Sequence, residues 1–222
     1  MTGGCVPSLG VSVPLQDRFS DVILESLAAG KYERAECDAL DRLLVAGDRV
    51  LELGSGLGLV AVRCAQRLGS TAVATVEADP EMLPVIRATC EANHVSPVVL
   101  SGAVSADGGD RWLERAPHLW STKAHRPLPA DAPPVNRQRV EGIQLSALIA
   151  AHRPTVLVVD IEGGESHLAP TDLPGVRAVL IECHSRADKL AVDAWLIPLG
   201  FGRSGDQPTR LRLYERTPHD GR

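Results

Sequence analysis

The sequence predicts an α/β protein with a Rossmann-like, doubly wound and mostly parallel sheet of seven strands. Short apolar runs alternate with amphipathic segments through most of the chain, which is typical of strands and helices in turn. A glycine-rich turn follows the apolar run Val50–Leu53, and acidic side chains follow several of the other runs. The 222 residues suit a single domain of this class, and we expect one domain over 1–222.

The first thirty residues are expected to form an N-terminal arm and a helix. Residues 1–16 are dotted with Gly, Ser and Pro and predict a loose arm, whereas residues 17–30 predict a short helix that ends at Gly30. A second helix is expected over 32–48, where Cys37, Leu40 and Leu43 recur at helical spacing and Gly47 marks the end.

The remaining elements follow from changes in period along the chain. Residues 80–93 open on Pro80, whose missing N–H costs little at the start of a helix. Gly200 closes another helical segment, and residues 210–216 show the alternation of an edge strand. The further predicted strands are 50–53, 71–77, 97–105, 155–160 and 177–184. The further predicted helices are 57–68, 80–93, 145–152 and 187–200.

Residues 105–139 interrupt this alternation of strands and helices. They contain five prolines together with Trp112 and Trp120, and they are far longer than the usual connection of about 4–6 residues. Inserts of this length without structure are usually lids, binding loops or disordered segments. We expect a mobile substrate lid with both tryptophans as apolar contacts, and a dimer contact or plain disorder remain alternatives.

Composition excludes several classes of function. The net charge of −5 argues against a nucleic-acid surface, which usually carries a basic excess. No run approaches the roughly 18 apolar residues of a membrane span, and no signal peptide is visible. The five cysteines contain no C-x-x-C pair, which favours a reduced, cytoplasmic protein. The expected partner is a small molecule, and a homodimer is compatible with the sequence.

The glycine-rich turn predicts a nucleotide-like cofactor. Glycines allow a tight strand-to-helix turn and a close approach of the ligand to the backbone. Glu77 ends the next strand, where an ionised carboxylate can accept hydrogen bonds from two ribose hydroxyls. The dinucleotide fingerprint G-x-G-x-x-G would place a glycine at Leu59, but the third glycine is Gly58. S-adenosylmethionine is therefore favoured over NAD, and an NAD-dependent dehydrogenase is the less favoured alternative.

The pattern acid-x-G-x-G-x-G, which begins at Glu52, resembles the first motif of class I S-adenosylmethionine-dependent methyltransferases. In that fold the motif wraps the methionine and ribose portions of the cofactor. The resemblance implies that Glu52 contacts the ammonium of the cofactor directly or through water. The cofactor-binding residues expected from the turn and the following strands are Tyr32, Glu52, Gly54, Ser55, Gly56, Glu77, Ala103 and Asp160.

Two later stretches extend the resemblance. "VVDIEGGE" (158–165) and "LIECH" (180–184) are similar to the D-x-E-G-x-E and E-x-H signatures of FkbM-type methyltransferases, and the likeness covers 30–184 apart from the insert. It implies an O-methyltransferase that acts on a hydroxyl of a sugar or a natural-product scaffold. The chain departs from the family at Glu52–Ser55, and at Val158 and Val159, where the family often has Lys-Ile.

The expected catalytic residues are Asp160, Glu182 and His184, because all three follow late strands of the predicted sheet. His184 is the preferred general base, since an ordinary histidine pKa of about 6.5 suits proton abstraction near neutral pH. A histidine that is only hydrogen-bonded at a strand end is the alternative. Glu162 and Glu165 are expected to be a turn acid and a helix N-terminal acid. A Mg²⁺-dependent reaction and carboxyl methylation stay open as alternatives.

Overall fold

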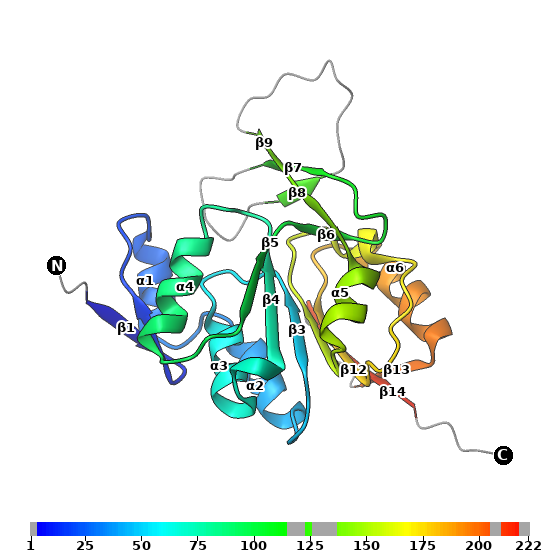
Figure 1. Ribbon diagram of the computed structural model, residues 1–222, viewed down its shortest axis with the longest axis horizontal. Helices are drawn as coiled ribbons and strands as arrows, with labels where there is room; N and C mark the ends of the chain where they lie inside the picture. The colour runs from blue at the N-terminus through cyan, green and yellow to red at the C-terminus, as the bar shows by residue number, and fades with distance from the viewer. Residues whose placement is uncertain (1–3, 115–122, 126–136, 205–209, 218–222) are drawn as a thin grey trace.

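The centre of the protein is a seven-stranded sheet (Figure 1), seen in a computed structural model that describes residues 4–114, 123–125, 137–204 and 210–217. Only β14 runs antiparallel to its neighbours, which confirms the predicted mostly parallel sheet. From one edge to the other, the strands are β13 (Phe201–Ser204), β14 (Leu211–Arg216), β12 (Ala178–Glu182), β11 (Val156–Val159), β3 (Val50–Leu53), β4 (Val73–Glu77) and β5 (Val98–Ser101).

Helices cover both faces of this sheet (Figure 1) because alternate residues of each buried strand point to opposite sides. Val50, Val158 and Leu180 pack in one core with α1 (Asp21–Ala28), α2 (Arg34–Leu43), α3 (Leu59–Leu68) and α4 (Leu83–Ala92). Leu51 and Val159 pack in a second core with α5 (Leu145–His152) and α6 (Arg186–Leu196). All six helices fall inside predicted segments or within one residue of them.

The tail of the sheet differs from the prediction. Residues 210–216 were expected to be an edge strand, but β14 lies between β12 and β13 and pairs with both. The edge is β13, which the sequence did not predict because its four residues, Phe201–Ser204, contain a glycine and an arginine. Phe201 and Tyr214 are buried in the core on the α5–α6 face, so the hairpin contributes to that core.

The N-terminal arm is structured rather than loose. It forms the hairpin β1 (Cys5–Ser8) and β2 (Val11–Pro14), which packs on α4. Leu9 and Gly10 both have positive φ, the backbone that two-residue hairpin turns require. Val11 and Val13 are buried, and the V-S-V alternation was the signal that the prediction overlooked.

The Pro-rich insert also contains regular structure, so the expectation of a structureless segment was wrong for its described part. Strand β7 (Arg111–Glu114) pairs with both β8 (Lys123–His125) and β9 (Arg137–Val140). This small sheet lies beyond one end of the central sheet (Figure 1). The predicted strand 97–105 is divided at Gly102: β6 (Ala103–Ser105) leaves the central sheet and pairs with β10 (Gly142–Gln144). Trp120 lies outside the described residues.

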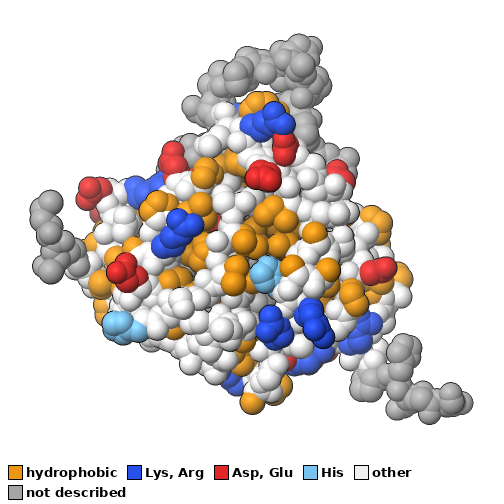
Figure 2. All heavy atoms as spheres, viewed as in Figure 1, with side chains coloured by type: hydrophobic (Ala, Val, Ile, Leu, Met, Phe, Trp, Pro, Cys, Tyr) orange, Lys and Arg blue, Asp and Glu red, His pale blue; other side chains and the backbone are white. Residues whose placement is uncertain are grey.

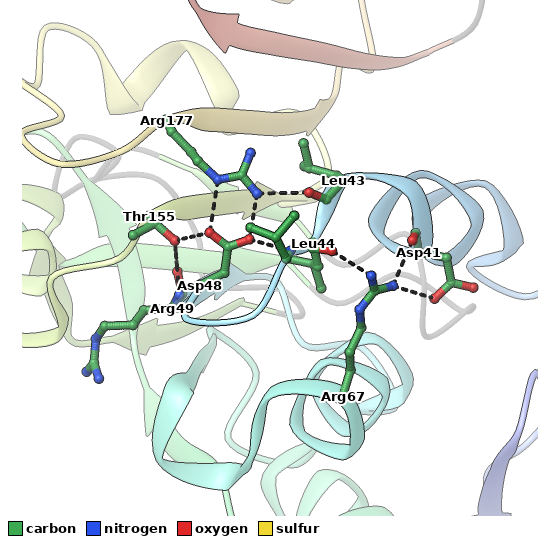
Figure 3. Close-up of polar contacts among 9 residues, drawn as sticks. Asp41, Leu43, Leu44, Asp48, Arg49, Arg67, Thr155 and Arg177 are labelled. Atoms are coloured by element: carbon green, nitrogen blue, oxygen red, sulfur yellow. Dashed lines mark hydrogen bonds and ion pairs between the residues drawn. The ribbon is translucent and has the colours of Figure 1, made fainter.

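A partly buried polar network secures the opposite end of the sheet, where three strands begin (Figure 3). Asp48, which precedes β3, accepts hydrogen bonds from Thr155 Oγ1 at 2.7 Å and from Arg177 Nε at 2.9 Å. Thr155 precedes β11 and Arg177 precedes β12. Burial would raise the pKa of Asp48, but the bonds from Arg177, Val45 N–H and Thr155 lower it. The network therefore fixes the starts of neighbouring strands around one ionised carboxylate.

All five cysteines are free thiols, four of them buried. Among the described helices, none combines the length and the apolar character that crossing a bilayer requires. In the space-filling view, apolar side chains gather in the middle of the face shown, with charged side chains nearer its rim (Figure 2).

Candidate functional site

The glycine-rich turn lies at the point where the strand order reverses. The chain proceeds from β3 outward to β4 and β5, and returns to place β11 on the other side of β3. In open parallel sheets this reversal leaves a crevice at the carboxyl ends of the strands, where ligands bind. Gly54 follows β3 and Asp160 follows β11, so the turn and the acid predicted from distant segments meet at this crevice.

Two of the glycines are required for different physical reasons. Gly54 has φ +88°, and a Cβ there would lie 1.7 Å from the backbone oxygen of Asp160. Gly56 has φ +51°, and a Cβ there would lie 2.7 Å from Tyr32 Oη and 2.9 Å from Glu33 Oε1. Gly54 thus lets the turn touch β11, while Gly56 lets Tyr32 and Glu33 close over the turn.

A cleft opens at this turn and encloses about 1030 Å³, part of it continuous with solvent. Six of the eight expected cofactor-binding residues line it, namely Tyr32, Gly54, Gly56, Glu77, Ala103 and Asp160. Arg111 and Leu113 from β7 also line it, whereas Trp112 between them is not among the lining residues. The insert therefore does contribute to the cleft, but through the side chains that flank the tryptophan, since neighbours on a strand point to opposite sides.

The carboxylate of Glu77 binds the backbone of the glycine-rich turn. Its Oε2 accepts hydrogen bonds from the N–H groups of Ser55 at 3.1 Å and Gly56 at 3.2 Å, and its Oε1 accepts one from Asp79 N–H at 2.8 Å. Burial raises the pKa of Glu77, and the three N–H donors oppose that rise. A carboxylate has about four acceptor positions and three are filled here, so Glu77 retains capacity for about one hydroxyl donor in the cleft.

Glu52 and Ser55 lie beneath the turn rather than in the cleft wall. Glu52 is 2% exposed, and Thr75 Oγ1 donates a hydrogen bond to its Oε2. Burial raises the pKa of Glu52 to about 8, and the bond from Thr75 opposes that rise. Ser55 Oγ lies 2.5 Å from Thr75 Oγ1. The expected contact of Glu52 with the cofactor is therefore not direct in this arrangement, and its visible partner is Thr75.

A second cluster stands on the other wall, where β11 and β12 end. His184 Nε2 lies 3.2 Å from Glu162 Oε2 and 3.6 Å from Asp160 Oδ1. On its other side, His184 Nδ1 lies 2.9 Å from Glu165 Oε1, which also accepts a hydrogen bond from Gly163 N–H at 3.0 Å. Glu165 is fully buried, so it orients the imidazole and leaves Nε2 facing the two carboxylates.

The charges of this cluster alter the expected role of His184. Burial alone would lower the pKa of His184, but the hydrogen bond to Glu165 and the charges of Glu162, Glu165 and Asp160 raise it. Burial raises the pKa of Asp160, with Glu182 and Glu162 adding to the rise and His184 opposing it. His184 is thus favoured as an imidazolium near neutral pH. It is also not among the residues that line the cleft, whereas Asp160 is.

The third expected catalytic residue, Glu182, lies in a pocket next to the cleft. This pocket also contains Glu33 and Glu36, and it shares Asp160 and Glu162 with the cleft. Glu33 follows Tyr32 directly, and the pair matches the Tyr-Glu that precedes the first helix in the family that the sequence resembles, which implies that both close over the cofactor. Glu165 was expected either among the strand-end acids that converge on the cleft or at a helix N-terminus. Its full burial beside His184 is visible only in three dimensions.

A metal ion is one candidate for this cluster. One ligand atom each from Asp160, Glu162 and His184 lies within 4.8 Å of the others. Mg²⁺ prefers oxygen ligands and a histidine ligand must be neutral, while the three acids around His184 favour its protonated form. The donor set therefore fits a carboxylate–imidazolium cluster better than a Mg²⁺ site.

Comparisons with known proteins agree with this geometry. A family model for protein-L-isoaspartate(D-aspartate) O-methyltransferase matches residues 25–129, which include the glycine turn and Glu77. The strand order, with β14 antiparallel inside the sheet, also departs from the classic dinucleotide-binding order. The fold is that of the class I methyltransferases. The cofactor that these enzymes use, S-adenosylmethionine, suits a glycine turn with a carboxylate at the end of the second strand.

The chain is also similar to individual methyltransferases. It is 41% identical over 83 residues to the ribosomal protein L11 methyltransferase of Thermus thermophilus, covering 36% of this chain and 32% of that protein. The match thus spans about a third of the relative's length. A solved structure from Streptococcus agalactiae, a protein of the NADB-Rossmann superfamily, aligns with a TM-score of 0.51 at 12% identity over 81% of this chain and 67% of its own.

A ribosomal protein L11 methylase structure from Lactobacillus delbrueckii subsp. bulgaricus aligns with a TM-score of 0.48 at 14% identity, over 83% of this chain and 77% of its own. The matching family model is not the FkbM family that the later signatures resemble. The family model and the strand order support the class I methyltransferase part of the sequence prediction, while the FkbM assignment stays a prediction.

Proposed function

We propose that this protein is an S-adenosylmethionine-dependent methyltransferase that methylates a hydroxyl group of a small molecule. The observation that carries the proposal is the contact between Gly54 and the backbone of Asp160. It brings the glycine turn, which fits the cofactor, and the strand-end acids into one cleft. The FkbM-like signatures at 158–165 and 180–184 support the choice of a hydroxyl acceptor.

In this proposal the cofactor supplies an electrophilic methyl group on a sulfonium. Glu77 accepts a hydrogen bond from a ribose hydroxyl, and Tyr32 covers the turn. The acceptor hydroxyl lies at Asp160, which takes its proton as the oxygen–methyl bond forms and the carbon–sulfur bond breaks. Placing the two reactants in line and excluding water provides much of the rate enhancement.

Asp160 replaces His184 as the proposed proton acceptor for a physical reason. A base must be deprotonated to act, and the acids around His184 favour its charged form. Asp160 lines the cleft, and its raised pKa brings it closer to neutral pH than an ordinary aspartate. His184, held by Glu165, then acts as a positioning residue whose charge lowers the pKa of Asp160 and so favours its ionised form.

The decisive experiment measures cofactor binding and methyl transfer separately. Isothermal titration with S-adenosylhomocysteine and with NAD tests the cofactor, and the absence of S-adenosylhomocysteine binding would overturn the proposal. Transfer of a labelled methyl group to a panel of hydroxyl compounds tests the reaction. Asp160→Asn is expected to lower kcat by about 10²–10⁴-fold, the usual contribution of acid–base catalysis.

His184→Asn provides a sharper test of the proposed roles. The rate should rise with pH as Asp160 loses its proton, and loss of the His184 charge should move this rise to higher pH, because that charge lowers the pKa of Asp160. His152→Asn, which changes a histidine at the far end of α5, serves as the matched control. An unchanged pH profile in His184→Asn would refute its positioning role. Methylation that persists unchanged in Asp160→Asn would make carboxyl methylation, which needs no base, the better interpretation.

Other acceptors are less favoured by this chain. The proteins it resembles include ribosomal protein methyltransferases, and a protein acceptor is the second candidate on that ground. The net charge of −5 and the carboxylates at the cleft work against RNA, whose phosphates would be repelled. A labelled-methyl assay with total ribosomal protein and with RNA, run beside the small-molecule panel, separates the three classes.

A further inference from the structure

The pocket next to the cleft is strongly acidic. It lies where α1 and α2 approach the ends of β11 and β12, and it encloses about 680 Å³, part of it open to solvent. Five of its nine lining residues are carboxylates and none is Lys or Arg: Glu33, Glu36, Asp160, Glu162 and Glu182. Such a concentration of one charge in a concave site attracts cations and repels anions.

His184 neutralises only part of the negative charge of this pocket. It lies within 4 Å of Asp160 and Glu162, so those two acids have a cationic partner. Glu33, Glu36 and Glu182 form no ion pair with any Lys, Arg or His in the part of the chain that the structure describes. Burial and the neighbouring acids raise the pKa of both Glu33 and Glu36, as expected for negative charge without a counter-ion.

Glu33 provides a second, independent indication of a missing donor. Its Oε2 is buried and has no hydrogen-bond partner among the described residues. Buried polar atoms are nearly always paired, because leaving one unpaired costs about 1–3 kcal/mol. Glu33 lines both the cleft and the acidic pocket, so a ligand of this site can supply the donor that Oε2 lacks.

The position of the pocket separates it from the cofactor. Glu36 and Glu182 line the acidic pocket and are not among the residues that line the cleft. A cofactor bound at the glycine turn therefore leaves these two acids for another ligand. Asp160 and Glu162 stand at the boundary, where the acceptor hydroxyl is placed in the proposed reaction.

We propose that the methyl acceptor carries a positively charged amine as well as its hydroxyl group, as amino sugars and amino alcohols do. The ammonium group lies among Glu33, Glu36 and Glu182 and offers up to three hydrogen-bond donors, while the hydroxyl reaches Asp160. The inference rests on the proposed methyltransferase function and narrows its substrate class.

The test uses pairs of compounds that differ only in charge. Glucosamine is compared with N-acetylglucosamine, and 1,3-diamino-2-propanol with its diacetylated form, by thermal shift and titration on the full chain saturated with S-adenosylhomocysteine. A ligand that binds the native state raises its melting temperature. We expect the amines to raise it and the acetylated compounds, which keep the hydroxyls, to leave it unchanged.

Variants assign the effect to the pocket. Glu36→Gln combined with Glu182→Gln should weaken amine binding by about tenfold or more, since hydrogen bonds to charged groups are worth about 1.5–3 kcal/mol, and should leave S-adenosylhomocysteine affinity unchanged. Glu91→Gln, an exposed acid on α4, is the matched control and should change neither. The same measurement with Mg²⁺ at equal ionic strength tests the metal alternative.

The outcomes distinguish failure of this inference from failure of the proposed function. Equal binding of the acetylated compounds, absence of binding by either amine, or amine binding that survives in the double variant overturns the inference. If S-adenosylhomocysteine abolishes amine binding, the acids bind the ammonium group of the cofactor. If Mg²⁺ binds and the double variant loses that binding, the pocket is a metal site. Either result also overturns the inference. If S-adenosylhomocysteine itself fails to bind, the proposed function fails whatever the amines do.

Discussion

Substitution of Gly54 by alanine tests the close contact on which the cleft depends. Gly47 is the matched control, because its φ of +90° is almost the same as the +88° of Gly54, but a Cβ there has no atom within 4 Å. Both alanines must adopt a left-handed backbone, at a cost of about 1–2 kcal/mol. Only the one at position 54 also meets the Asp160 oxygen, at 1.7 Å.

The additional cost at Gly54 follows from the contacts on either side. β3 and β11 must separate locally by more than an ångström, and overpacking of this kind costs about 1–3 kcal/mol. The separation also strains the bonds from Asp160 N–H to Leu53 O and from Gly54 N–H to Val76 O, both 2.9 Å and each worth about 1 kcal/mol. We expect a loss of about 3–6 kcal/mol for Gly54→Ala and about 1–2 kcal/mol for Gly47→Ala.

Urea denaturation followed by far-UV circular dichroism measures both losses, with equal m-values required for the comparison. S-adenosylhomocysteine affinity is the second readout and should fall only in the Gly54 variant, because the turn moves away from Asp160. Gly56→Ala is a milder variant if the first does not fold, since its Cβ meets only the side-chain ends of Tyr32 and Glu33. Equal losses of stability at positions 47 and 54, with affinity retained, would refute the argument that close approach dictates the glycine.

Three further predictions concern acids with different partners. Glu77→Ala should weaken S-adenosylhomocysteine binding by about tenfold to a hundredfold in titration calorimetry, because a hydrogen bond to a charged group is lost. Glu77→Gln, which keeps one acceptor oxygen, should lose less. The pKa of Glu52, raised to about 8, lies above its unfolded value of about 4.3, so folding stability should fall as pH rises between the two. Glu52→Gln should reduce the pH dependence of the unfolding free energy by roughly 3–5 kcal/mol over this range, as followed by urea denaturation. An unchanged slope would show that Glu52 is ionised in the folded protein. Asp48→Asn should lower stability by about 1–3 kcal/mol through its partner Arg177, whereas Asp38→Asn, in an exposed pair, should cost about 0.5 kcal/mol or less. Because the pKa of Asp48 is lowered, this difference should be complete above the unfolded aspartate value and shrink as pH falls through the lowered one.

Local patterns were sufficient to predict most elements of the fold. The helix over 145–152 matches α5 residue for residue, because apolar spacing and flanking residues define a helix within one turn of chain. The N-terminal hairpin and β13 were missed. Proline, glycine or polar residues interrupt the apolar pattern of these four-residue strands, whereas the equally short β3 and β11 are almost entirely apolar. The pairing partners of the missed strands supply the stability that their local sequence lacks.

The candidate site was predictable where a residue's role depends on its place in a strand or turn. Gly54, Gly56 and Glu77 were found from spacing alone, and the structure places all three in the cleft. His184 was found as well, but its charge state was not, because that depends on three acids from the turn after β11. Trp112 was expected to be an apolar contact of the lid, but it does not line the cleft. Which side of a strand faces the cleft depends on how the insert packs on the rest of the protein.

The sequence by itself determined the alternation of strands and helices, the glycine register and the acids at the strand ends, because these follow from backbone geometry over a few residues. Only the tertiary structure decided which of those acids touch. It joined Glu165 to His184 across 19 positions and set the carbonyl of Asp160 against Gly54. It also gathered Glu33, Glu36 and Glu182 into one pocket. Electrostatic effects and steric contacts depend on distance in space, which a linear pattern does not contain.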